Sequence, residues 1–115
     1  MKTLIILLLP ILSFGQIDDK TKHVYAGTFI SIGSGATINY FTHKHALSVV
    51  SGVLIGCTAG VLKEVYDKNN GGTCDNWDAG ATIWGSLLGG ISLRVYLDCQ
   101  DKRNNLEKRK LDYYN

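Results

Sequence analysis

The chain has 115 residues and a net charge of +2, which leaves room for one domain and is too small a charge to favour nucleic acid as a partner. Thirteen glycines and one proline are unusual for a soluble domain of this length. The charged residues are also segregated, because residues 24–42, 45–62 and 79–93 contain no Asp, Glu, Lys or Arg. These features favour a membrane protein over a soluble domain.

The first 16 residues, MKTLIILLLPILSFGQ, are typical of a secretory signal peptide. One lysine, Lys2, precedes a short apolar run, and Ser13 and Gly15 supply the small residues of a cleavage site. We expect cleavage after Gly15 or Gln16. The alternative is a retained anchor, but the run is shorter than the roughly 20 residues that a membrane span needs. No cysteine lies near the cut, so we expect no lipid anchor there.

The three cysteines, Cys57, Cys74 and Cys99, do not form a CxxC pattern. We therefore interpret them as unpaired and expect neither a metal site nor another cofactor.

Three apolar segments follow the signal, at residues 23–42, 45–62 and 79–97. Each is long enough for a helix to cross the hydrocarbon core, and none alternates as a strand would. We predict an all-α fold, a small bundle of three membrane-associated or transmembrane helices within residues 17–97. The first segment is the least apolar, and the alternative is a soluble periplasmic helical domain.

The charged tail, residues 98–115, indicates the orientation. Basic residues near span ends stay in the cytoplasm, and six lie at or after the end of the third segment: Arg94, Lys102, Arg103, Lys108, Arg109 and Lys110. The loop 63–78 then faces the periplasm of a bacterial envelope. The tail could form a short helix, but we favour a solvated and partly disordered end. As partners we expect membrane lipids but no nucleic acid, and we allow for a homo-oligomer.

Small residues recur every four positions in each segment, which places them on one face of a helix. They are Gly27, Ser31 and Gly35 in the first segment, Gly52, Gly56 and Gly60 in the second, and Gly85 and Gly89 in the third. Such ridges let membrane helices pack closely. Each ridge ends in an ionisable residue at the periplasmic end, namely His23, Glu64 and Asp78, so packing would bring these residues together.

We therefore predict a polar cluster at that end, formed by His23, Lys63, Glu64, Asp67 and Asp78. Simpler roles are open for each residue. Glu64 and Asp67 could be solvated at a helix end, Asp78 could be a helix N-cap, and Lys63 could reach the lipid headgroups. Trp77 would anchor the interface.

Three motifs, DKTKH, GVLKEVYD and DAGATIWGSLLGG, resemble the YfiM-like periplasmic lipoprotein family of small bacterial proteins and, more distantly, the VanZ-like membrane proteins. The resemblance covers residues 19–93 and singles out Lys20, His23, Gly60, Lys63, Glu64, Asp67, Asp78, Gly85 and Gly89. Two departures are Thr82, where VanZ-like proteins have Asn, and the lack of a lipidated cysteine. The resemblance implies a helical envelope protein and supplies no reaction.

We expect a small envelope membrane protein whose polar cluster binds a lipid or cell-wall precursor headgroup. One alternative is a holin-like pore. Another is a small hydrolase of lipid-linked substrates, with Glu64 as general base, Asp67 or Asp78 positioning it, and His23 or Lys63 holding an anion. No nucleophile or metal pattern accompanies these residues, so we favour a role without catalysis.

Overall fold

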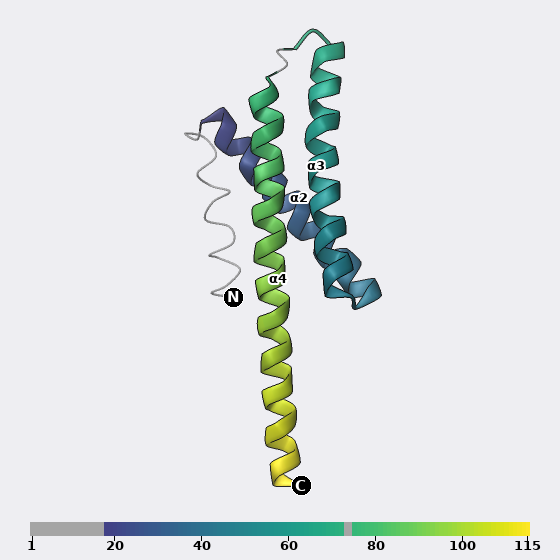
Figure 1. Cartoon of the computed structure of the whole chain (residues 1–115), viewed down its shortest axis with the longest axis vertical. Coiled ribbons are helices and arrows are strands. Elements are labelled where there is room, and N and C mark those ends of the chain that lie inside the picture. Colours follow the sequence, from purple (N-terminus) through teal and green to yellow (C-terminus); the bar gives the residue numbers. More distant parts are fainter. Residues whose placement is uncertain (1–17, 73–74) are drawn as a thin grey trace.

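A computed structural model describes residues 18–72 and 75–115, and within them the protein is all-helical. Its helices are α2 (Asp19–Thr42), α3 (His45–Asn69) and α4 (Asn76–Tyr114), with no strand in the described residues (Figure 1). This confirms the all-α class and the presence of one helix over each apolar segment. The predicted signal peptide, residues 1–16, lies outside the described part of the chain.

Short connections with local caps join the helices. His43 ends α2 in the left-handed conformation, at φ 53°, and donates its N–H to the carbonyl of Asn39 at 2.8 Å. The turn after α3 contains Gly71 at φ 75°. The N-cap of α4 is Asp75, whose carboxylate accepts from the N–H of Trp77 at 3.0 Å. Asp78 therefore lies in the first turn of α4 and is not the cap.

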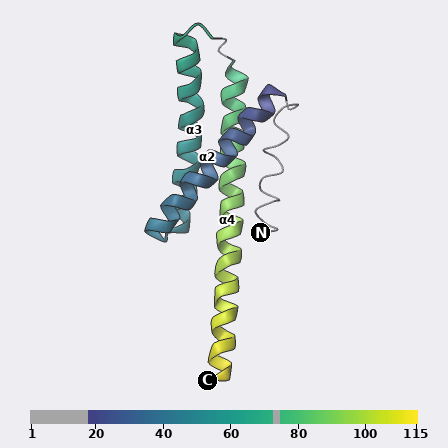
Figure 2. The same cartoon turned by 180° about the vertical axis from the view of Figure 1, so that it is seen from behind.

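The helices form a bundle in which α3 runs antiparallel to its two neighbours. Gly60 of α3 lies against Thr82 of α4, and Gly56 lies against Ser86. Residue numbers therefore decrease along α3 in the direction in which they increase along α4. Both views show α2 crossing the pair obliquely (Figures 1 and 2). All three helices contact one another, and the glycine faces lie in these contacts.

The interior consists of small and polar residues. Only Leu93 and Leu97 are buried large apolar residues among those described, whereas the fully buried side chains are Ser31, Ser48 and Ser86. The approach between backbones is close, because a Cβ on Gly52 would lie 2.5 Å from the carbonyl oxygen of Ser31. Such contacts are typical of helices that associate in lipid, where small residues allow backbone-to-backbone packing.

The exterior of the bundle is apolar. The exposed side chains include Phe29, Ile30, Leu47, Val50, Leu54, Ile55, Val61, Leu62, Leu88, Ile91 and Val95. A soluble protein of this size buries such residues, because their removal from water is the main stabilising contribution to folding. The arrangement is therefore reversed relative to a soluble helical domain.

Among the described helices, α3 alone is long and apolar enough to cross a membrane by length and composition. Of the three segments predicted to span a membrane, only the one in α3 thus has both the required length and the required hydropathy. The helices α2 and α4 do not meet this criterion.

The charged tail continues α4 without a break, so that this helix has 39 residues and is about 58 Å long at 1.5 Å per residue. Residues 101–115 are exposed and extend beyond the bundle (Figure 1). Where the sequence favoured a partly disordered end, the structure has a helix.

Thr28 provides a test of the α2–α4 contact. Its hydroxyl lies 2.8 Å from the carbonyl oxygen of Val24 in its own helix and 2.9 Å from that of Gly85 in α4. Thr28→Val keeps the shape and removes the hydroxyl, and we expect it to lower the free energy of unfolding by about 0.6 kcal/mol. Thr37→Val is the matched control, since Thr37 is exposed and bonds only to Gly33 of the same helix. Denaturant titration of both variants in detergent micelles measures the difference. Equal effects at the two positions would contradict the assignment.

Candidate functional site

The polar site lies at the end of the bundle where α3 leads into α4. His23 lies one turn before Gly27 on α2, Glu64 one turn after Gly60 on α3, and Asp78 one turn before Thr82 on α4. Gly60 packs on Thr82, and a Cβ on Gly27 would meet the backbone of Thr82. The adjoining turns of the three helices, which carry His23, Glu64 and Asp78, therefore lie at the same level of the bundle.

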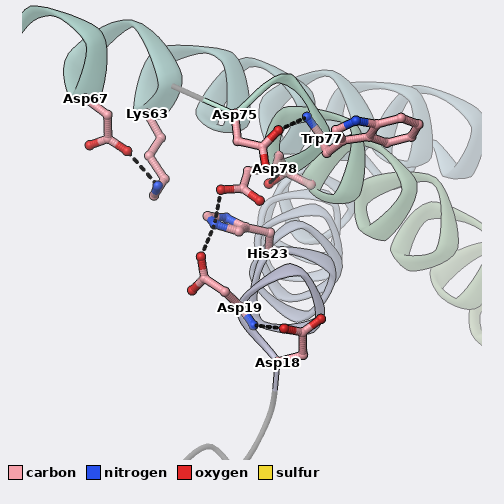
Figure 3. Close-up of polar contacts among 9 residues, drawn as sticks. Asp18, Asp19, His23, Lys63, Asp67, Asp75, Trp77 and Asp78 are labelled. Carbon is pink, nitrogen blue, oxygen red and sulfur yellow. Dashed lines mark hydrogen bonds and ion pairs between the residues drawn. The ribbon is translucent and has the colours of Figure 1, made fainter. Parts of the chain in front are cut away.

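His23 and Asp78 form the centre of the site (Figure 3). The Nε2 atom of His23 lies 3.4 Å from Oδ2 of Asp78, and the two side chains are 10% and 14% exposed. Asp19, one turn before His23 on α2, places its Oδ2 atom 3.9 Å from the same nitrogen and is itself 73% exposed. The side chains of α2 and α4 thus form a buried pair with a carboxylate at its solvent-facing rim.

Glu64 is a buried carboxylate without a full set of partners. The residue is 8% exposed, and its Oε2 atom makes no hydrogen bond in the described structure. It continues the buried stripe Gly52, Gly56 and Gly60, the face of α3 that packs on α2 and α4. Burial of an unpartnered carboxylate is costly and requires an explanation.

Lys63 and Asp67 form a separate pair outside this buried group. The ammonium group of Lys63 donates to Oδ2 of Asp67 at 2.8 Å, one turn along α3 (Figure 3). The hydrogen bond with Asp67 raises the pKa of Lys63 above its ordinary value, and the charges of Asp67, Glu64 and Asp78 act in the same direction. Of the predicted cluster, the structure brings His23 to Asp78 and Lys63 to Asp67, and it buries Glu64 without a hydrogen bond to its Oε2 atom.

The sequence interpretation missed one contributor. Asp19 joins the site because it lies four residues before His23, a spacing that places two side chains on one helix face; this signal was present in the sequence. Lys20, which was singled out by the resemblance alone, places its ammonium group 5.9 Å from the centre of the Trp77 ring. Trp77 itself is exposed, as an interface anchor would be.

The opposite end of the bundle has a different polar group. His45 at the start of α3 lies 3.5 Å from a carboxylate oxygen of Asp101 and 3.9 Å from one of Asp98. His43, which ends α2, and His45 are therefore remote from Glu64, which lies near the other end of α3.

Comparison with known proteins found no matching family model, no matching curated protein and no matching solved structure.

The site combines the imidazole of His23 with the carboxylates of Asp19 and Asp78, from α2 and α4, and Glu64 of α3 is buried at the same end of the bundle. Such a donor set can bind a cation or accept hydrogen bonds from a polar ligand. Thr82, the nearest hydroxyl below it on α4, is buried and donates to the carbonyl oxygen of Asp78 at 3.1 Å. The geometry therefore favours binding of a ligand over attack by a hydroxyl nucleophile.

Proposed function

We propose that this protein is a small helical membrane protein of the bacterial envelope that binds a lipid or lipid-linked cell-wall precursor by its headgroup. The observation that carries the proposal is the reversed distribution of side chains together with the buried polar group at one end. Apolar residues cover the outside of the bundle, and serines fill its centre. Beyond the last small residues His23 contacts Asp78, and Glu64 is buried at the same end.

Placement in a membrane explains how α2 and α4 accompany α3. A helix of moderate hydropathy can lie in the bilayer if its polar face is packed against other helices. In α2 and α4 the polar groups are satisfied within the bundle, because the hydroxyls of Thr28 and Ser86 bond to backbone carbonyls. Three spans with a periplasmic loop 63–78 and a cytoplasmic tail are part of the proposal, as are the signal peptide and the YfiM-like and VanZ-like relationship.

The position of the site suits a headgroup. Ionisable side chains that face the interior of a membrane bundle are functional candidates, and here they lie at the level where the apolar exterior gives way to the loop. Lys20 and Lys63 flank the buried acids, so a headgroup with both an anionic and a cationic or hydroxyl part would find partners for each.

The proposal predicts that binding depends on the buried residues. Purified protein in nanodiscs of neutral phosphatidylcholine is titrated with a polyprenyl-linked muropeptide precursor that carries a free ammonium group, and binding is followed by the fluorescence of Trp77 in a Trp84→Phe background. We expect Glu64→Gln to weaken binding at least tenfold, about 1.4 kcal/mol, because it removes the negative charge that would pair with the ammonium group and keeps the shape of the side chain.

His45→Ala, at the opposite end of the bundle, is the control and is expected to bind as the parent does. Unchanged affinity in a folded Glu64→Gln variant, or equal loss in both variants, would contradict the proposed site. Titration with phosphatidylglycerol and phosphatidylethanolamine in the same nanodiscs distinguishes ordinary lipids from a lipid-linked precursor.

A further inference from the structure

We propose that the end of α4 that extends beyond the bundle binds an acidic helix of a partner protein through one basic face. This basic face combines an apolar row, Cys99, Leu106 and Tyr113, with four cations, Lys102, Arg103, Arg109 and Lys110. At about 100° per residue, these side chains fall within about 120° of the helix circumference. The acids of residues 98–115 all lie outside this arc, at Asp98, Asp101, Glu107 and Asp112. Charges of the two signs are thus separated onto different sides of the helix.

The members of the basic face recur every seven residues. Cys99, Leu106 and Tyr113 have this spacing, and so do the two pairs of cations on either side of them, Lys102 with Arg109 and Arg103 with Lys110. A repeat of seven lets a helix present one continuous seam to a second helix, and the charges beside the seam select the partner. Leu106 is 59% exposed and stands between two shallow hollows that these cations line, one of which also includes Glu107.

The four cations have no charged partner in this chain. None of them forms an ion pair with any described residue, whereas Arg94, nearer the bundle, pairs with Asp98 at 3.2 Å. Beyond Asp101, α4 is exposed along its whole length and extends away from the other helices (Figures 1 and 2). Helices in proteins gain most of their stability when one face packs on another element. The basic face is therefore available to an element of a different molecule.

The chemistry of the face indicates which molecule fits it. A second copy of the chain would place cations opposite cations on both sides of the apolar row, so repulsion opposes pairing through the same face. Nucleic acid would pair with the cations but would leave Leu106 and Tyr113 against its charged backbone. A protein helix with apolar residues at the same repeat and Glu or Asp beside them matches both the apolar row and the charges.

The membrane surface is too far from part of this face. α4 continues without a break along the long axis of the molecule (Figure 1). If it leaves the hydrocarbon core after Leu97, Arg109 and Lys110 lie about 18 and 20 Å further along, at 1.5 Å per residue. The headgroup layer is roughly 5–8 Å thick, and salt screens charges over about 8 Å. These two cations would therefore stand in water. This comparison alone rests on the proposed function.

The test uses full-length protein in phosphatidylcholine nanodiscs and a fluorescent synthetic helix as the probe. The probe has leucine at every seventh position with glutamate on both sides of each leucine, and a second probe replaces each glutamate by lysine. Fluorescence anisotropy measures the dissociation constant at low and high salt. We expect the glutamate probe to bind, with an affinity that falls as salt is raised, and the lysine probe not to bind.

Two identical substitutions on opposite sides of the helix locate the binding face. Lys110→Glu is expected to weaken binding of the glutamate probe about threefold, and Lys102→Glu with Lys110→Glu about tenfold, because each replaces an attraction by a repulsion. Lys108→Glu makes the same change of charge about 160° away from Lys110 and should leave the affinity unchanged. Acylation followed by mass spectrometry should show that the probe protects Lys102 and Lys110 but not Lys108.

Absence of saturable binding of the glutamate probe, or equal weakening by Lys108→Glu and Lys110→Glu, would overturn the proposal. Protection of Lys102 and Lys110 by phosphatidylglycerol nanodiscs without the probe would instead assign the face to the membrane. Binding of a DNA duplex with the same dependence on these variants would assign it to nucleic acid. All three lysines are exposed, so the substitutions leave the bundle intact, and circular dichroism verifies this. The face lies at the opposite end of α4 from Asp78, so loss of headgroup binding would leave these results unchanged.

Discussion

Leu54→Arg is expected to prevent stable insertion of the bundle into a membrane. Leu54 lies near the middle of the apolar stretch 45–62 of α3, and its side chain is 60% exposed on the outer face. If that face contacts lipid, an arginine there costs about 2.5–3.5 kcal/mol, which corresponds to a roughly hundredfold change in the insertion equilibrium. The measurement is the fraction of the chain that remains in the membrane pellet after alkaline carbonate extraction.

The same substitution separates the two interpretations of the fold. On the surface of a soluble helical domain, a change from an exposed leucine to arginine alters stability by no more than about 0.5 kcal/mol. Leu106→Arg is the matched control, because Leu106 is 59% exposed in the charged part of α4, beyond the bundle. If Leu54→Arg and Leu106→Arg are both retained in the pellet as the parent is, the lipid-facing assignment of α3 is wrong.

Gly85→Ala is expected to disrupt the packing of α2 on α4. A Cβ at this position would collide with the main-chain carbonyl of Val24, and backbone cannot move aside as a flexible side chain can. We expect a loss of about 2–3 kcal/mol in the free energy of unfolding, although alanine favours a helix more than glycine does. Denaturant titration in detergent micelles measures this loss.

Gly33→Ala is the internal control for that experiment. Gly33 lies on the exposed side of α2, and a Cβ there would meet nothing within 4 Å. With no contact to oppose it, the higher helix propensity of alanine is expected to stabilise the protein by up to about 1 kcal/mol. The two substitutions are chemically identical, so opposite signs would isolate the effect of helix contact, and the same sign would contradict the packing described here.

The positions of the helices could be predicted because their signals are local. Charge-free stretches of membrane length, a turn rich in Asn and Gly, and small residues four apart all depend on the geometry of one helix. The four-residue spacing that continues from Gly60 to Glu64 and from Gly27 back to His23 also indicated which ionisable residues would end each packing face. These features require no knowledge of how the helices cross.

Other parts of the site depended on contacts between helices. Asp67 and Glu64 lie three residues apart near the end of α3, yet Glu64 is buried and Asp67 pairs with Lys63 at the surface. A rotation of α3 by one residue, about 100°, would change which acid is directed inward. No local pattern specifies that rotation, because it is set by the contacts of Gly56 with Ser86 and of Gly60 with Thr82.

The sequence by itself determined three helices, their glycine faces and the end at which His23, Glu64 and Asp78 gather. Only the tertiary structure decided that Asp75 and not Asp78 caps α4, and that Glu64 is left buried with a free oxygen. The physical reason is the range of each interaction. Helix formation and periodicity act over a few residues of one chain segment, whereas the partners of a buried carboxylate lie on other helices, at distances that their packing sets.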